Sequence, residues 1–95
     1  MSMRAKQFLI SGRVQGVCFR SEAKRRADLL TLTGWVRNTD NGDVEILAQG
    51  EEEALLNFER WCQRGPLAAE VRHVSTHAVL VSGSLASFDI RSTEA

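Results

Sequence analysis

The sequence has no long apolar run, and it contains little cysteine and little proline. No stretch approaches the roughly 18–20 consecutive apolar residues needed to cross a bilayer, and the N-terminal MSMRAKQ lacks the apolar segment of a signal peptide. One proline and seven glycines among 95 residues leave no low-complexity stretch apart from the short polar end STEA. These absences argue against a membrane span. We expect a single cytoplasmic domain over residues 1–95, with a flexible tail at 92–95.

The two cysteines, Cys18 and Cys62, are too few for a disulfide framework. In a cytoplasmic chain we expect both to be reduced and to act as small apolar side chains. A phosphatase with a cysteine nucleophile has five residues between that cysteine and its arginine, whereas only Phe19 separates Cys18 from Arg20. Cys18 is therefore predicted to be structural.

Net charge is also absent, since twelve basic residues balance twelve acidic ones. No overall field therefore attracts nucleic acid or an anionic membrane. The charges are nevertheless unevenly placed: seven basic residues fall within positions 1–26, opposed only by Glu22, and residues 38–59 contain seven acids and no Lys or Arg. The basic end either suits a small anionic ligand or is an ordinary solvated face.

The spacing of apolar residues predicts the order of the secondary-structure elements. Asn41-Gly42 indicates a type I′ hairpin turn between two paired strands. We expect strands at 6–12, 33–38, 43–49, 70–81 and 87–91, and helices from Cys18 to Leu30 or Thr31 and from Glu51 to just before Gly65. The order βαββαβ, with an additional edge strand, predicts an α+β fold of the ferredoxin-like α/β sandwich type. Its two helices should cover one face of an antiparallel sheet.

The stretch GRVQGVCFRSEAKRRA, residues 12–27, joins the first strand to the first helix. Free N–H groups at a helix N-terminus bind phosphate or carboxylate. Gly16 permits a positive φ or a close approach of the backbone to a ligand, and Arg20 can bind an anion through two hydrogen bonds. The Lys-Ser/Thr pair of a nucleotide-binding P-loop is missing here. On composition alone the stretch is either an anion site or an ordinary connection with a surface arginine.

Three longer segments resemble one known family. GRVQGVCFR followed by TGWVRNTDNGDVE resembles acylphosphatase, and RWCQRGPLAAEVRHV is similar to the second-helix region of that family. The first two segments are separated by the interval usual in the family, and the resemblance extends from about Phe8 to Val74. Thr31 replaces a common glycine, Ala23 a common threonine and Ser92 a common aromatic, which bears on local stability more than on chemistry.

The resemblance implies hydrolysis of acyl phosphates to a carboxylate and inorganic phosphate, without a metal, a cofactor or a covalent phosphoenzyme. We expect a monomer, because the motif needs only one chain, and a small acyl phosphate as its partner; zero net charge and the lack of a long apolar run predict no nucleic acid and no membrane. The implied site consists of Arg20 and the backbone N–H groups of Val14, Gln15, Gly16, Val17, Cys18 and Phe19 around the phosphoryl group, Asn38 orienting the attacking water, and Thr39 supporting the Asn38 amide.

Other readings of the sequence fit less well. His73 and His77 lie four residues apart on a predicted strand, about 13 Å, which is too far for one metal ion. Glu51–Glu53 at a helix start complement the helix dipole, and Trp35 is predicted to pack rather than to stack on RNA bases. The stronger rival is a non-catalytic phosphate-binding module, because acylphosphatase-like domains also occur inside larger carbamoyl-transfer maturation enzymes. A free-standing chain that begins with Met favours the independent enzyme.

Overall fold

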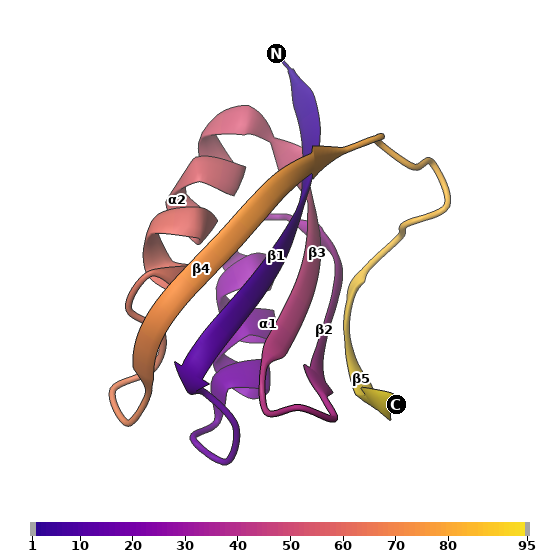
Figure 1. Ribbon diagram of the computed structural model, residues 1–95. Coiled ribbons are helices and arrows are strands. Elements are labelled where there is room, and N and C mark those ends of the chain that lie inside the picture. The colour runs from indigo at the N-terminus through magenta and orange to yellow at the C-terminus, as the bar shows by residue number, and fades with distance from the viewer. Residues whose placement is uncertain (1, 95) are drawn as a thin grey trace.

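Five strands and two helices follow one another in the computed structural model, which describes residues 2–94 (Figure 1). In chain order they are β1 (Met3–Arg13), α1 (Phe19–Leu29), β2 (Thr33–Thr39), β3 (Val44–Glu51), α2 (Glu52–Cys62), β4 (Glu70–Val79) and β5 (Phe88–Glu94). The predicted ferredoxin-like βαββαβ order is confirmed, and β5 is the additional edge strand. Neither helix, each of 11 residues, is long and apolar enough to cross a membrane.

The strands form one sheet in the order β4-β1-β3-β2-β5. Four of them pair antiparallel as predicted, but β5 runs parallel to β2, so the sheet is mixed. The connection at 80–87 explains this difference, since it crosses from one edge of the sheet to the other at the end where β4 stops (Figure 1). Because β5 starts at that end, it must run opposite to β4 and hence in the direction of β2.

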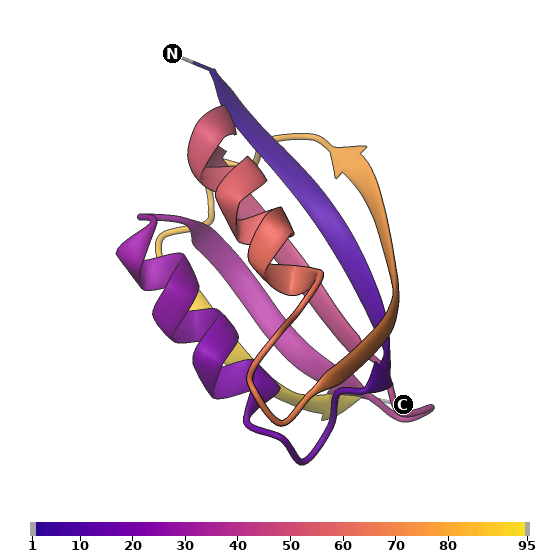
Figure 2. The same cartoon turned by 90° about the vertical axis from the view of Figure 1, so that its left-hand side faces the viewer.

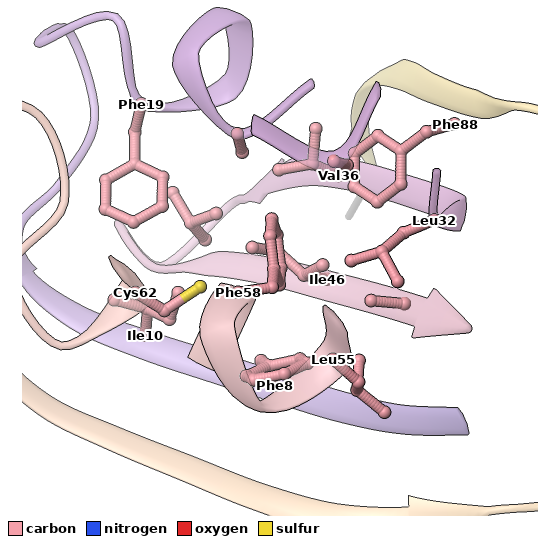
Figure 3. Close-up of a cluster of buried hydrophobic side chains, with 14 of the residues drawn as sticks. Phe8, Ile10, Phe19, Leu32, Val36, Ile46, Leu55, Phe58, Cys62 and Phe88 are labelled. Atoms are coloured by element: carbon pink, nitrogen blue, oxygen red, sulfur yellow. The ribbon is translucent and has the colours of Figure 1, made fainter. Parts of the chain in front are cut away.

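Both helices pack on the same face of the sheet (Figure 2), and the core lies between these two layers. The apolar spacing of each helix defines the face that it buries: Phe19, Ala23 and Ala27 of α1 and Leu55, Phe58 and Cys62 of α2 are all buried. Phe58 lies near the centre of the cluster in Figure 3, with its ring centroid 5.7 Å from that of Phe8 and 6.0 Å from that of Phe88. Aromatic packing therefore fixes α2 to the sheet, and the first residue of α1, Phe19, packs in turn on Trp61 of α2 with ring centroids 5.3 Å apart.

The boundaries differ from the prediction mostly at strand ends. β1 begins at Met3, because its first residues pair with the end of β3 as far as Glu51, and β4 ends at Val79. β5 continues to Glu94, so residues 92–94, expected in a tail, extend the strand; residue 95 of that tail lies outside the described residues.

The turn between β2 and β3 is not the predicted type I′ turn. That turn needs positive φ at both Asn41 and Gly42, whereas only Gly42 has one, at 97°. The Gly42 N–H donates to the Thr39 carbonyl at 3.3 Å, and the Thr39 N–H donates to the Asp43 carbonyl at 2.9 Å. These contacts make a three-residue loop with a bulge at Gly42, and they bring Thr39 and Asp43 opposite one another.

The face of the sheet without helices carries a polar cluster around Trp35. The guanidinium groups of Arg37 and Arg91 lie 5.4 Å and 4.8 Å from the Trp35 ring centroid, and Arg37 Nε donates to Glu45 Oε1 at 2.7 Å. The half-buried indole is thus covered by two arginines of its own chain, which is the packing role predicted for it.

Candidate active site

The loop between β1 and α1 is fixed at both ends by buried apolar side chains. Val14 is 1% exposed and Phe19 is 2% exposed, whereas Gly16 and Cys18 between them face solvent. The backbone is left-handed at Gly16, with φ 74°, and at Cys18, with φ 65°, but not at Val17. Alternation of handedness along a short loop turns successive N–H groups toward one side, the arrangement of an anion-binding nest. We call residues 14–19 the cradle.

Gly16 is needed for its backbone conformation rather than for space. A Cβ placed on it meets no atom within 4 Å, but its φ of 74° is a conformation that residues with side chains rarely adopt. Cys18 adopts a similar conformation without being glycine. It is the N-cap of α1 and makes no side-chain cap hydrogen bond. The start of α1 therefore leaves its N–H donors to a ligand.

The structure brings Arg20 and Asn38 together, as the resemblance implied. A depression of about 240 Å³ lies at the N-terminus of α1, against the ends of β2 and β5. Its lining consists of Val14, Gly16, Cys18, Phe19, Arg20, Ser21, Asn38 and Ile90. Such a volume accommodates a phosphoryl group with a neighbouring water molecule.

Arg20 reaches this depression from the first turn of α1. Its Nη1 donates to the carbonyl oxygen of Arg91 at 3.2 Å, so strand β5 sets the direction of the guanidinium. The remaining donors of the planar group are available for an anion, and a bidentate contact with a phosphoryl group uses two of them.

Asn38 reaches the same depression from the end of β2, where it pairs with Val44 of β3. No side-chain hydrogen bond among residues 2–94 engages its amide, so within that part of the chain the amide is open to a ligand. Thr39 was expected to support this amide, but its hydroxyl closes the hairpin instead: Oγ1 contacts Asn41 Oδ1 and accepts from the Asp43 N–H at 3.0 Å.

One contact at the site was missed from the sequence. Gln15 was expected to contribute its backbone N–H, but its side chain also donates from Nε2 to the carbonyls of Thr39 and Asp43, both at 2.8 Å. A local sequence pattern gives no signal for it, because its partners lie 24 and 28 residues away.

The two cysteines are free and lie in opposite environments. Cys62 is buried in the core as predicted, and burial, with a smaller contribution from the charge of Glu59, raises the pKa of its thiol. Cys18 was expected to be a small apolar side chain with a structural role, but it is exposed at the depression, where its backbone is left-handed.

A larger cavity, of about 670 Å³, lies at the other end of the helical layer. It is lined mainly by apolar side chains of β1, α2, the end of β4 and the residues just after it, among them Met3, Leu55 and Leu80, and it contains none of the predicted site residues. Volume alone would favour this cavity. Convergent polar groups favour the smaller depression.

The fold and the site define a ferredoxin-like α+β domain with a depression at a helix N-terminus that Arg20 and Asn38 both line. A model of the acylphosphatase family matches residues 6–90. Among curated relatives, the acylphosphatase of Synechococcus sp. (strain CC9311) is 51% identical over 85 residues, covering 90% of this chain and 93% of the relative. That of Methylococcus capsulatus is 41% identical over 88 residues, covering 93% and 96%.

The comparison with solved structures also finds an acylphosphatase. The acylphosphatase from Bacillus subtilis superposes with a TM-score of 0.89 at 36% identity, covering 95% of this chain and 99% of that one. Full-length HypF in its phosphate- and nucleotide-bound form matches with a TM-score of 0.88 at 29% identity, covering 97% of this chain but only 12% of HypF. The chain belongs to the acylphosphatase family, and as an enzyme of that family it hydrolyses acyl phosphates.

Proposed function

We propose that the chain hydrolyses the carboxyl-phosphate bond by direct attack of water, with Arg20 and the cradle binding the phosphoryl group and Asn38 positioning the water. The observation that supports this most directly is the meeting of Arg20 and Asn38 in one depression, from elements that are distant in sequence. In this proposal the N–H groups of residues 14–19 and the Arg20 guanidinium surround the three non-bridging phosphoryl oxygens. Asn38 approaches from the hairpin side and accepts from, or donates to, the attacking water.

The bond changes in this proposal are simple. The water oxygen forms a bond to phosphorus while the bond from phosphorus to the acyl oxygen breaks, and the electron pair of that bond leaves with the carboxylate. The proton of the water passes to a phosphoryl oxygen, so the products are a carboxylate and inorganic phosphate.

The chemistry of the substrate explains why so small a site suffices. Phosphoryl transfer has a loose transition state, so positioning and charge stabilisation contribute most of the catalysis. The leaving group is a stable carboxylate, and a weak neutral nucleophile is then sufficient. A guanidinium with several preorganised N–H donors stabilises the charge on the phosphoryl oxygens without a metal ion. An amide such as Asn38 can orient water without removing its proton.

The environment of the reaction follows from the same proposal. We propose a monomer that acts in the cytoplasm on a small acyl phosphate, with no nucleic acid or membrane partner. One chain is enough to form the depression, because it is lined by residues of this chain, among them Arg20, Asn38 and Ile90.

A non-catalytic phosphate-binding module is the second candidate. It is favoured by the match to HypF, in which a domain of this fold is part of a much longer chain. The rate of acyl phosphate hydrolysis separates the two candidates. A module that only binds phosphate needs no amide to position water and should not raise this rate.

The decisive measurement is the loss of benzoyl phosphate in the presence of a chelator and without added metal. We expect a rate far above spontaneous hydrolysis, with inorganic phosphate as a competitive inhibitor. A rate equal to the spontaneous one would sink the enzymatic proposal and favour the binding module. A rate abolished by the chelator and restored by metal would contradict the metal-free mechanism alone.

A further inference from the structure

The side chain of Gln15 joins the cradle to the hairpin that carries Asn38. Both hydrogen bonds of the Gln15 Nε2 amide end on backbone carbonyls of the hairpin, those of Thr39 and Asp43, at 2.8 Å each. Gln15 belongs to the cradle through its own backbone, and Thr39 follows Asn38 directly. One amide group therefore links the two halves of the candidate site.

Among residues 2–94, no pairing of β1 with β3 reaches this point. The ladder between β1 and β3 ends with the pair Ile10 and Val44, and Val44 is the partner of Asn38 on β2. Beyond these pairs β1 continues to Arg13 beside β4 alone, and the cradle follows it, while the turn 40–43 follows the end of β2 at Thr39. The Gln15 side chain bridges them past the end of the ladder.

The geometry of the bridge fixes orientation as well as distance. A carboxamide NH₂ group has two hydrogens in fixed directions, and here each meets a different acceptor. The acceptors are themselves held by the hairpin, because the Thr39 N–H donates to the Asp43 carbonyl at 2.9 Å and the Gly42 N–H donates to the Thr39 carbonyl at 3.3 Å. A displacement of either carbonyl would break a hydrogen bond to Gln15.

We propose that Gln15 is a positioning residue that keeps the bound phosphoryl group in line with the water on Asn38. This role rests on the proposed function, since alignment matters only if Asn38 places the water. In-line attack is sensitive to geometry, and a misplacement of about 1 Å costs on the order of 10²-fold in rate. The phosphate-binding groups are on one side of the bridge and Asn38 is on the other, so loss of the bridge impairs turnover more than phosphate binding.

The first test replaces the amide by an apolar side chain of similar size. In Gln15→Leu we expect kcat for benzoyl phosphate to fall about 10- to 100-fold, while the inhibition constant of inorganic phosphate changes less than about threefold. Gln7→Leu is the matched control, because Gln7 is also half-buried and its Nε2 donates to Glu45 Oε2 at 2.6 Å on the opposite face of the sheet. The control should keep the wild-type kcat.

The second test uses a side chain that can switch its donor on and off. An ionised Glu at position 15 has no hydrogen to donate to the two carbonyls, whereas the protonated form can donate to one of them. Two acceptor carbonyls favour the protonated form, which places its pKa above the ordinary value of about 4.3. The kcat of Gln15→Glu, divided by that of Gln15→Leu, should rise as the pH falls through the pKa of the introduced carboxyl group. The ionisable residues within three positions of Gln15 or of its acceptors, and Arg20 of the same depression, are present in both variants, so their own titration is common to the numerator and the denominator of the ratio. These residues are Arg13, Cys18, Arg20, Arg37, Asp40, Asp43 and Glu45.

A third measurement does not depend on catalysis. Hydrogen exchange at the Thr39 and Asp43 amides, both bonded within the hairpin, should be at least several-fold faster in Gln15→Leu than in wild type. Unchanged exchange would overturn the bridge itself, whether or not the wild type is active. Equal losses of kcat and phosphate affinity, an unchanged kcat, or a pH-independent ratio would overturn the positioning role. A wild type without turnover would overturn the proposed function and alignment with it, and exchange would still decide whether the bridge exists.

Discussion

The two ends of α1 use the same unusual backbone conformation for different purposes. Cys18 precedes the helix with φ 65° and Thr31 follows it with φ 58°, and within residues 2–94 they are the only residues other than glycine with positive φ. At the C-terminal end the conformation closes the helix: the Leu32 N–H donates to the Ala27 carbonyl at 2.9 Å and the Thr31 N–H to the Asp28 carbonyl at 3.1 Å. At the N-terminal end no side chain caps the helix.

This difference separates a structural cost from a functional one. The closed end is a Schellman motif, which satisfies the last carbonyls and normally uses glycine at the position of Thr31. The strained backbone of Thr31 makes no hydrogen bond that a glycine at this position would not make as well. The open end lies in the candidate site, where left-handed residues are suited to turn N–H groups toward an anion. In the proposed mechanism, strain there is part of the binding arrangement. The predictions below test the open end through its chemistry and the closed end through its stability.

The largest effect is expected at Arg20. Arg20 supplies a positive charge beside the N–H donors at the N-terminal end of α1, and Arg20→Gln removes it. The substitution should lower kcat/KM by about 10³-fold and weaken inhibition by inorganic phosphate. Steady-state kinetics with benzoyl phosphate measure both. Arg25→Gln removes the same charge from an exposed position on α1 and serves as the control. An equal effect of the two substitutions would show that only the overall charge of the helix matters.

A substitution of Asn38 tests the residue of β2 that shares the depression with the N-terminal end of α1. Asn38→Ala should lower kcat by about 10²-fold, the scale of one positioned catalytic group, while the inhibition constant of phosphate stays close to wild type. Asn57→Ala, an exposed amide on α2, should change neither quantity. If phosphate binding and turnover fell together in Asn38→Ala, Asn38 would belong to the phosphate site and the water would be positioned by another group.

Thr31 tests the closed end. Thr31→Gly removes a left-handed strain of about 1–2 kcal/mol, offset in part by the greater freedom of glycine in the unfolded chain, so the free energy of unfolding should rise by about 1 kcal/mol. This corresponds to a rise in Tm of about 4–8 °C by calorimetry, with unchanged kcat. Thr31→Ala keeps a Cβ and should stabilise far less. Equal gains from glycine and alanine would place the cause in the threonine side chain rather than in the backbone.

Thr31 also shows what could be predicted from the sequence. The departure from glycine was visible, and so were the helix stripes from Phe19 to Ala27 and from Leu55 to Cys62, because helical periodicity is a local signal. Arg20 and Asn38 were found by resemblance to a family, not by periodicity. The parallel β5 and the Gln15 bridge could not be predicted, because they depend on where distant segments meet. The exposure of Cys18 follows from a φ angle that the residue type disfavours, which no propensity indicates.

Cys18 allows both ends of α1 to be compared with one substitution. Cys18→Gly keeps the left-handed conformation without a Cβ, so it should stabilise the fold in the same way as Thr31→Gly, by about 0.5–1 kcal/mol, the smallest effect expected here. Phosphate affinity and kcat should stay within about twofold of wild type, since the cradle contributes N–H groups rather than a thiol. Cys18→Ser retains the Cβ and removes the thiol, and it should change neither stability nor rate by much. A tenfold loss of kcat in both variants would mean that the exposed thiol takes part in the reaction. A loss in the glycine variant alone would mean that the strain at Cys18, unlike the strain at Thr31, is needed to keep the cradle in its binding conformation.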